Sequence, residues 1–205
     1  MTYWDERFRE GDYPQDPDPS PVLRRYVDSL PEGRAFDLAT GTGRNAVFLA
    51  EAGYEVDAMD QSREGLEIAR ANARDRGVAD RINWIEGSVE TYPFPESAYD
   101  VVTVSYFRAI DWFTDIKGML AADGVLFVEH HLRSVEPNEV GPSNDRYRFA
   151  ANELLHACLD LTVLYFDVIA EEMPDGRNTT VTRILARKSS GAAQQYPRVP
   201  SPAAE

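Results

Sequence analysis

Cysteine, lysine and long apolar runs are all scarce in this chain. Cys158 is the only cysteine among 205 residues, which excludes a disulfide framework and a thiolate zinc cluster. No apolar run approaches the roughly 20 residues that cross a bilayer. The first residues, MTYWDERFRE, are too charged for a secretory signal. We therefore expect a cytoplasmic protein with no membrane span and no bound metal.

The charge of the chain is strongly negative. Asp and Glu number 35 against 21 Lys and Arg, for a net charge of -14, and only Lys117 and Lys188 are lysines. A nucleic-acid binder needs a cationic face, so nucleic acid is not an expected partner. The same excess argues against anionic membrane surfaces. Two interpretations remain: a solvated acidic surface that aids solubility, or the protein of a halophile, in which salt screens the acidic surface. The scarcity of lysine favours the halophile.

Strand and helix patterns alternate through the middle of the chain. Strands are predicted at 34–39, 54–60, 82–87, 99–107 and 124–131, and helices at 43–53, 62–77 and 110–121. Such βαβ units build a parallel sheet. After a long loop at 132–150 and a helix at 151–159, segments 162–172 and 179–188 are typical of a hairpin. The predicted fold is α/β: a doubly wound, mostly parallel seven-stranded sheet with an antiparallel strand from the C-terminal hairpin.

The length favours one domain, which we place at residues 1–188. Residues 1–30 are expected to hold two helices and to act as a lid. The first helix spans Tyr3–Glu10, and the second starts at Pro21 with Ser20 as its N-cap. The tail at 189–205 is small, polar and Pro-rich, and is expected to be disordered.

The stretch FDLATGTGRN, residues 36–45, predicts a nucleotide site. Gly41 and Gly43 follow a strand and precede a helix. Glycine lets backbone approach a ligand closely, and the helix N-terminus attracts an anion. Asp60 ends the next strand and can accept both hydroxyls of a ribose. Nicotinamide dinucleotides and S-adenosylmethionine both carry such a ribose, so the glycine spacing alone does not separate them.

Asp37 separates the two cofactors. A dinucleotide would bring a pyrophosphate to this turn, where a carboxylate repels it. S-adenosylmethionine would bring an ammonium, which an acid attracts, and a carboxylate, which suits the helix N-terminus and Arg44. The alternative is that Asp37 is a structural acid that caps the turn. We therefore predict S-adenosylmethionine as the cofactor.

At this point the chain resembles a known family. FDLATGTGRN, followed by VDAMDQS, is similar to motif I and the second-strand acid of class I S-adenosylmethionine-dependent methyltransferases. WDERFREGDYP and RYRFAANELLHACLDLTVLYFD resemble the tellurite-resistance and thiopurine-type branch. The resemblance covers residues 1–188. Many members of the family have glycine at the position of Ala39. Alanine is tolerable there if the residue has a negative φ. Ser88 stands where an acid often meets the adenine.

The resemblance implies roles for the cofactor site. Asp37, Gly41 and Gly43 would hold the amino-acid end. Asp60 would bind the ribose and Gln61 would lie beside the adenine, while Ser105 would face the methionine part. Ser88 would contact the adenine with its side chain and Val89 with its backbone. Gln61 and Ser105 could equally be polar residues that only end their strands. The full predicted set is Asp37, Ala39, Gly41, Gly43, Arg44, Asp60, Gln61, Ser88, Val89 and Ser105.

The resemblance also implies a small-molecule methyl acceptor and in-line transfer. A sulfonium methyl is already activated, so alignment and water exclusion matter most, and no catalytic residue is assigned. His130 and His131 are candidate bases, but alternation along a strand turns at most one of them to the site. The predicted acceptor pocket comprises Trp4, Tyr13, Tyr106, Phe107, His131 and Arg146.

Two other functions stay open. One is a non-catalytic module that binds S-adenosylmethionine, and the other is a nucleotide-dependent oxidoreductase. The protein is expected to be a monomer or a dimer.

Overall fold

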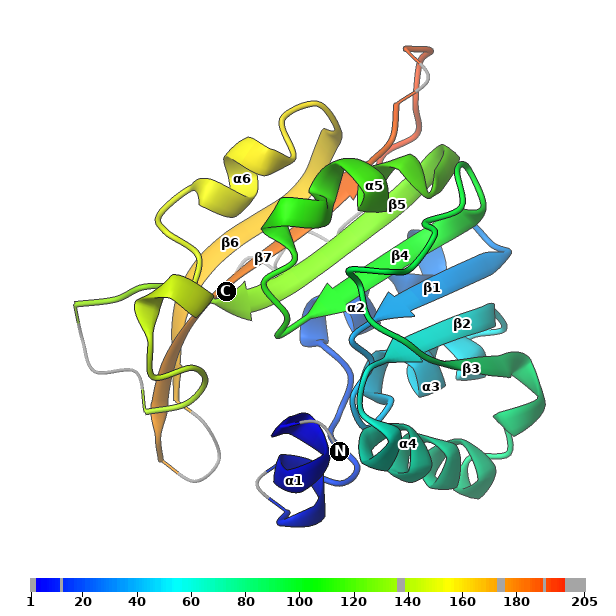
Figure 1. Cartoon of the computed structure of the whole chain (residues 1–205). Coiled ribbons are helices and arrows are strands. Elements are labelled where there is room, and N and C mark those ends of the chain that lie inside the picture. Colours follow the sequence, from blue (N-terminus) through cyan, green and yellow to red (C-terminus); the bar gives the residue numbers. More distant parts are fainter. Residues whose placement is uncertain (1–2, 12, 136–138, 173–175, 190, 198–205) are drawn as a thin grey trace, which may run out of the picture.

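A seven-stranded sheet with helices on both faces forms the protein (Figure 1). The computed structural model describes residues 3–11, 13–135, 139–172, 176–189 and 191–197. The strand order is β3-β2-β1-β4-β5-β7-β6. The predicted α/β fold is therefore confirmed. In the part of the chain that the structure describes, none of the helices has the length and apolar character needed to span a membrane.

The sheet is parallel from β3 to β5, and β7 runs antiparallel to both of its neighbours. The hairpin of β6 and β7 thus supplies the antiparallel strand, as predicted. The strands are β1 (Arg34–Leu38), β2 (Glu55–Asp60), β3 (Ile82–Glu86), β4 (Tyr99–Ser105), β5 (Leu120–His131), β6 (Thr162–Glu172) and β7 (Asn178–Arg187).

The helices begin close to the predicted positions. They are α1 (Tyr3–Arg9), α2 (Pro21–Tyr26), α3 (Arg44–Glu51), α4 (Arg63–Asp75), α5 (Phe113–Gly118) and α6 (Glu153–Ala157). Ser62 caps α4, because its side chain accepts a hydrogen bond from the Gly65 N–H. Ser20 precedes α2, with Pro21 at the first position, but its side chain does not cap the helix.

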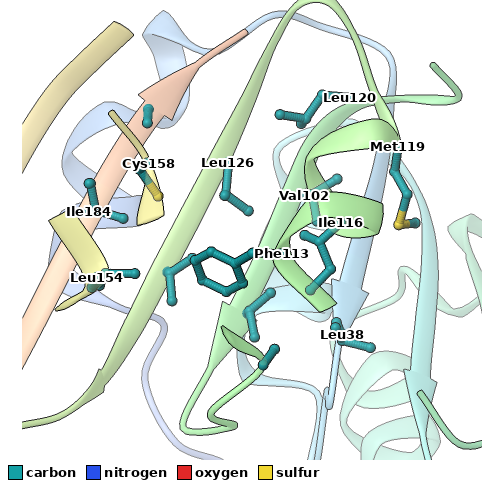
Figure 2. Packing of buried hydrophobic residues seen from close by; sticks show 14 of the residues in the cluster. Leu38, Val102, Phe113, Ile116, Met119, Leu120, Leu126, Leu154, Cys158 and Ile184 are labelled. Atoms are coloured by element: carbon teal, nitrogen blue, oxygen red, sulfur yellow. The ribbon is translucent and has the colours of Figure 1, made fainter. Parts of the chain in front are cut away.

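Two apolar cores cover the two faces of the sheet. On one face α5 and α6 pack against β4, β5 and β7 through residues such as Phe113, Leu126 and Leu154 (Figure 2). On the other face Leu23 of α2 and Leu49 of α3 pack with Phe127. Because successive side chains of a strand point to opposite faces, Leu126 and Phe127 serve different cores.

The boundaries of β5 correct the predictions. The strand begins at Leu120, whereas the prediction began it at residue 124 and placed a turn at 122–124. Those residues form an irregularity in the strand, in which Asp123 has φ 63° and donates its N–H to the Lys188 carbonyl at 3.0 Å. The predicted helix at 110–121 consists of a 3₁₀ turn, Ile110–Trp112, followed by α5.

Two further segments differ from the predictions. β4 ends at Ser105, because Tyr106 has φ 56° and leaves the strand. The predicted loop at 132–150 contains a 3₁₀ turn, Asp145–Tyr147, and Leu132 forms a bridge with Phe149. Residues 136–138 of that loop lie outside the described residues, as do residues 190 and 198–205 of the predicted disordered tail.

Candidate functional site

The glycine turn lies between β1 and α3, at the carboxyl edge of the parallel strands. Gly41 has φ 56° and Gly43 has φ 87°, so both adopt the left-handed conformation. A side chain at Gly43 would also meet α4, because a Cβ there would lie 2.9 Å from the Cβ of Ala69. Glycine therefore sets both the shape of the turn and the close approach of α3 to α4.

Ala39 does not have the negative φ that would let alanine replace the family's glycine without strain. Its φ is 56°, not negative. A residue with a Cβ pays about 1–2 kcal/mol for this conformation. The turn therefore imposes left-handed backbone at three positions, and alanine fills one of them under strain.

Asp60 ends β2 and ties it to the glycine turn. Its Oδ2 accepts the Gly41 N–H at 2.8 Å, and its Oδ1 accepts the Ser62 N–H at 2.8 Å. Burial raises the pKa of the carboxyl above its usual range, and the two N–H groups oppose that rise. Each carboxylate oxygen can accept a second hydrogen bond. The acid can thus still accept two ribose hydroxyls.

Asp37 is enclosed by hydroxyl groups. Thr40 donates to its Oδ2 at 2.6 Å and Thr103 donates to its Oδ1 at 2.5 Å. Burial raises the pKa of Asp37 to about 6, although both hydroxyls and the Ala46 N–H favour the charged form. This geometry is that of the structural acid that was the alternative interpretation. The role of Asp37 toward an ammonium stays a prediction.

The N-terminal helix α1 lies over the turn, on the side of the sheet toward which β1 and β4 point (Figure 1). Phe8 is buried, and a Cβ at Gly41 would lie 3.4 Å from its ring. The rings of Trp4 and Tyr13 lie 6.3 and 5.5 Å from the Phe8 ring. The predicted lid residues Trp4 and Tyr13 therefore belong to one aromatic cluster beside the turn, and sequence reasoning missed its central member, Phe8.

The residues predicted to face the methionine part and the adenine differ in their side-chain contacts. Asn45 donates to the Ser105 hydroxyl at 2.9 Å, which links the start of α3 to the end of β4. Gln61 is exposed at the end of β2. The hydroxyl of Ser88 accepts the Glu90 N–H at 3.3 Å within a turn after β3, and Val89 is half-buried beside it. Asn45 is a further residue that the sequence analysis did not assign.

Arg44, Tyr106 and His131 come together at the ends of β4 and β5. The Arg44 guanidinium lies 5.3 Å from the centre of the Tyr106 ring, and the His131 ring lies 4.9 Å from it. Below them, Glu129 is buried, and Arg44 approaches its Oε2 to 3.6 Å. Burial raises the pKa of Tyr106 to about 12, with the Glu129 charge as a further cause.

Glu129 anchors a buried charge network. Arg183 donates to its Oε1 at 2.9 Å and also pairs with Glu171 and Asp167. The signal for this network was in the sequence: a charged residue interrupts the apolar run of β5, and such a residue is rarely buried without a partner.

The two adjacent histidines have different hydrogen-bond partners, although their ring centres lie only 5.7 Å apart and do not point to opposite sides as alternation predicted. His130 Nε2 lies 2.7 Å from the Tyr147 carbonyl oxygen, and His131 Nδ1 lies 3.0 Å from the Thr179 hydroxyl. Burial lowers the pKa of His130 to about 4 and that of His131 to about 3. Both imidazoles are therefore neutral at neutral pH and are weak bases.

Of the six predicted pocket residues, only Tyr106 and His131 belong to this cluster, since Trp4 and Tyr13 lie with Phe8 and the remaining two make other contacts. Phe107 stacks on Trp112 with ring centres 6.0 Å apart and belongs to the core around α5. Arg146 is exposed, and its guanidinium lies 4.4 Å from the ring centre of Tyr147.

The donors and acceptors at this edge fit S-adenosylmethionine. A half-buried guanidinium at Arg44 can meet a carboxylate, Asp60 can meet a ribose, and the glycine turn leaves backbone close to the surface. Within the described part of the chain, His, Cys, Asp and Glu side chains form no group of three or more that could hold a metal ion.

Comparison with known proteins agrees with this geometry. Residues 35–124 match the model of a family described as "Methyltransferase domain". The chain has a class I methyltransferase fold. Solved structures that share this fold include proteins described as SAM-dependent methyltransferases. A curated relative, the uncharacterized methyltransferase YcgJ of Bacillus subtilis, is 29% identical over 118 residues, which are 54% of this chain and 46% of the relative.

Solved structures share the methyltransferase fold over most of the chain. TehB from Haemophilus influenzae is 19% identical with a TM-score of 0.68, covering 82% of this chain and 61% of TehB. The [4+2]-cyclase SpnF is 18% identical with a TM-score of 0.65, covering 83% of this chain and 79% of SpnF. The chain spans less than half the length of the curated relatives it matches, so these likenesses establish the fold and not the reaction.

Proposed function

We propose that the protein transfers a methyl group from S-adenosylmethionine to a small-molecule acceptor. The observation that carries this proposal is the antiparallel β7 between β5 and β6, in a chain that also matches a methyltransferase domain. A dinucleotide oxidoreductase of the doubly wound type would continue its sheet with parallel strands. The oxidoreductase is therefore the weaker interpretation.

The carboxyl edge of the sheet supplies the cofactor contacts. Asp60 accepts the ribose hydroxyls, and Arg44 with the N-terminus of α3 meets the carboxylate of the amino-acid end. Gln61, Ser88 and Val89 border the adenine. Because Asp37 already accepts two hydroxyls, its first effect is to hold the turn in shape, and its charge favours a nearby ammonium.

The acceptor pocket is proposed to use aromatic residues from two places: the cluster of Trp4 and Tyr13 beside the glycine turn, and Tyr106 at the end of β4. When bound, S-adenosylmethionine supplies a methyl group activated by the sulfonium. Trp4, Tyr13 and Tyr106 exclude water and align the nucleophile behind that methyl group. The neutral, weakly basic histidines support an acceptor that is already deprotonated at neutral pH, such as a thiolate or a similar soft anion. This acceptor class fits the tellurite-resistance and thiopurine-type branch, to which the sequence motifs also point.

A screen of acceptors tests the proposal. Purified protein is incubated with S-adenosylmethionine and small thiols, amines, phenols and oxyanions, and release of S-adenosylhomocysteine is measured. We expect acceptor-dependent release with at least one soft nucleophile. Methylation of tRNA or protein without small-molecule activity would contradict the acceptor class.

The same assay separates the enzyme from a non-catalytic module. The fold also occurs in a protein described as a [4+2]-cyclase, so the fold alone does not establish methyl transfer. Tight binding of the cofactor with no turnover on any acceptor would favour the module.

We also propose a cytoplasmic protein from a halophile. The net charge of -14 supports this, since self-repulsion weakens as the screening length falls from about 10 Å in 0.1 M salt to about 3 Å in 1 M salt. The melting temperature is expected to rise between dilute buffer and molar salt. A melting temperature that stays constant or falls would count against this origin.

A further inference from the structure

The first turn of α4 receives a carboxylate from a distant part of the chain. Asp5 of α1 is only 6% exposed, and its Oδ1 accepts the Ser62 hydroxyl at 2.7 Å and the Glu64 N–H at 3.4 Å. A buried carboxylate is costly unless it is hydrogen-bonded. The N-terminus of a helix is the place where a negative charge is favoured.

Asp5 fixes the orientation of Ser62. A hydroxyl has one proton, and here it goes to Asp5, which leaves a lone pair toward the Gly65 N–H at 3.2 Å. The backbone N–H of the same Ser62 donates to Asp60. The hydrogen bonds therefore run without a break from Asp5 through Ser62 and Asp60 to Gly41 of the glycine turn.

The apolar contacts of α1 also reach α4 and the glycine turn. Phe8 lies one turn after Asp5, and a Cβ at Gly65 would lie 3.0 Å from its ring, next to the contact at Gly41. Arg9 pairs with Glu64. A seven-residue helix is not stable alone in water, so α1 owes its position to these contacts with the turn and α4.

We propose that Asp5 is a positioning residue for the cofactor site, which holds Ser62 and thereby the ribose-binding Asp60 in place. This inference rests on the proposed function, since it takes Asp60 as the ribose acid. Docking of α1 and binding of the cofactor are then coupled, and each strengthens the other.

Calorimetry with S-adenosylhomocysteine tests the proposal on four proteins: wild type, Asp5→Ala, Ser62→Ala and the double variant. Asp5→Ala is expected to weaken binding about five- to tenfold, within the usual range of coupling between sites. Ser62→Ala should weaken binding similarly, and the double variant should be no weaker than either single one. Asp5→Asn keeps an acceptor oxygen and should restore most of the affinity.

Glu6→Ala is the matched control, because Glu6 is the exposed acid next to Asp5 on the same helix. The affinity of this variant for S-adenosylhomocysteine should equal that of wild type. Affinity of Asp5→Ala within twofold of wild type would overturn the proposal. So would additive losses in the double variant, or a fall in the melting temperature of the ligand-free protein with unchanged affinity. Absence of binding by the wild type would instead overturn the proposed function, and this inference with it.

Discussion

The N–H of Gly41 donates to the carboxylate of Asp60 at 2.8 Å, across the carboxyl ends of β1 and β2. The residue that shapes the glycine turn and the residue that would bind the ribose are thus one hydrogen-bonded unit. A change at Asp60 should therefore alter both cofactor binding and the stability of the turn.

Replacing Asp60 separates these two effects. Asp60→Asn keeps one acceptor oxygen and removes the charge, so affinity for S-adenosylhomocysteine should fall by about 1.5–3 kcal/mol, roughly tenfold or more. Asp60→Asn leaves one of the two N–H groups without its acceptor and Asp60→Ala leaves both, so the free energy of unfolding should fall more in Asp60→Ala, by about 1–3 kcal/mol. Titration calorimetry and urea unfolding measure the two quantities. Unchanged affinity in folded Asp60→Asn would remove this acid from the site.

The strained Ala39 offers a stabilising substitution. Ala39→Gly removes the strain of a φ of 56°. Glycine also gives the unfolded chain more conformational entropy, which offsets part of this gain. The free energy of unfolding should therefore rise by about 0.5–1 kcal/mol. Ala52→Gly is the control, because Ala52 is exposed at the end of α3 with φ -77°, and it should not stabilise. A less stable Ala39→Gly variant would show that the strain is absent.

The buried histidines predict acid destabilisation. Their folded pKa values, about 4 and about 3, lie below the unfolded value, so the unfolded chain binds more protons between pH 4 and 6. Stability should therefore fall as pH drops through this window, by about 1.4 kcal/mol per pH unit for each histidine. Asp37, with its pKa raised to about 6, acts in the opposite direction, because the folded state keeps its proton there.

Variants of the histidines test this pH dependence by chemical unfolding at several pH values. His131→Gln should reduce the slope of stability against pH by about 1 kcal/mol per pH unit. His156→Gln changes the exposed third histidine and should leave the slope as in wild type. Equal slopes for wild type and His131→Gln would contradict the prediction.

Glu129→Ala should destabilise the protein. Arg183 is 5% exposed and would lose its buried partner but keep Asp167 and Glu171, so the free energy of unfolding should fall by about 2–3 kcal/mol, less than for a buried charge left without any partner. Glu55→Ala breaks the exposed pair with Arg81 at 3.2 Å and should change the free energy of unfolding by less than about 1 kcal/mol. Similar small losses for both variants, measured by urea unfolding, would show that the buried network adds nothing to stability.

The positions of the strands and the mostly parallel sheet could be predicted from the sequence because they follow from local periodicity and turn residues, whereas the order of the strands was not predicted. Gly41, Gly43 and the cap at Ser62 mark element ends by local chemistry, and the hairpin of β6 and β7 has its own alternation. The start of β5 could not be predicted, because Asp123 carries a turn signal and the pairing with Lys188 overrides it. Long-range contacts of this kind leave no local pattern.

The candidate site was predictable in its residue types and less so in its contacts. The acid at Asp60 and the turn could be placed from spacing alone. The enclosure of Asp37 by Thr103 depends on a residue 66 positions away, and the approach of Phe8 to Gly41 depends on how α1 docks. Nothing local in the sequence indicates either contact.

Calorimetric titration of the purified protein with S-adenosylhomocysteine, and separately with NAD⁺ and NADH, tests the central claim most directly. The site at Gly41, Arg44 and Asp60 predicts one binding event per chain for S-adenosylhomocysteine and no saturable heat for either dinucleotide. Saturable binding of NAD⁺ or NADH, with none for S-adenosylhomocysteine, would contradict the claim.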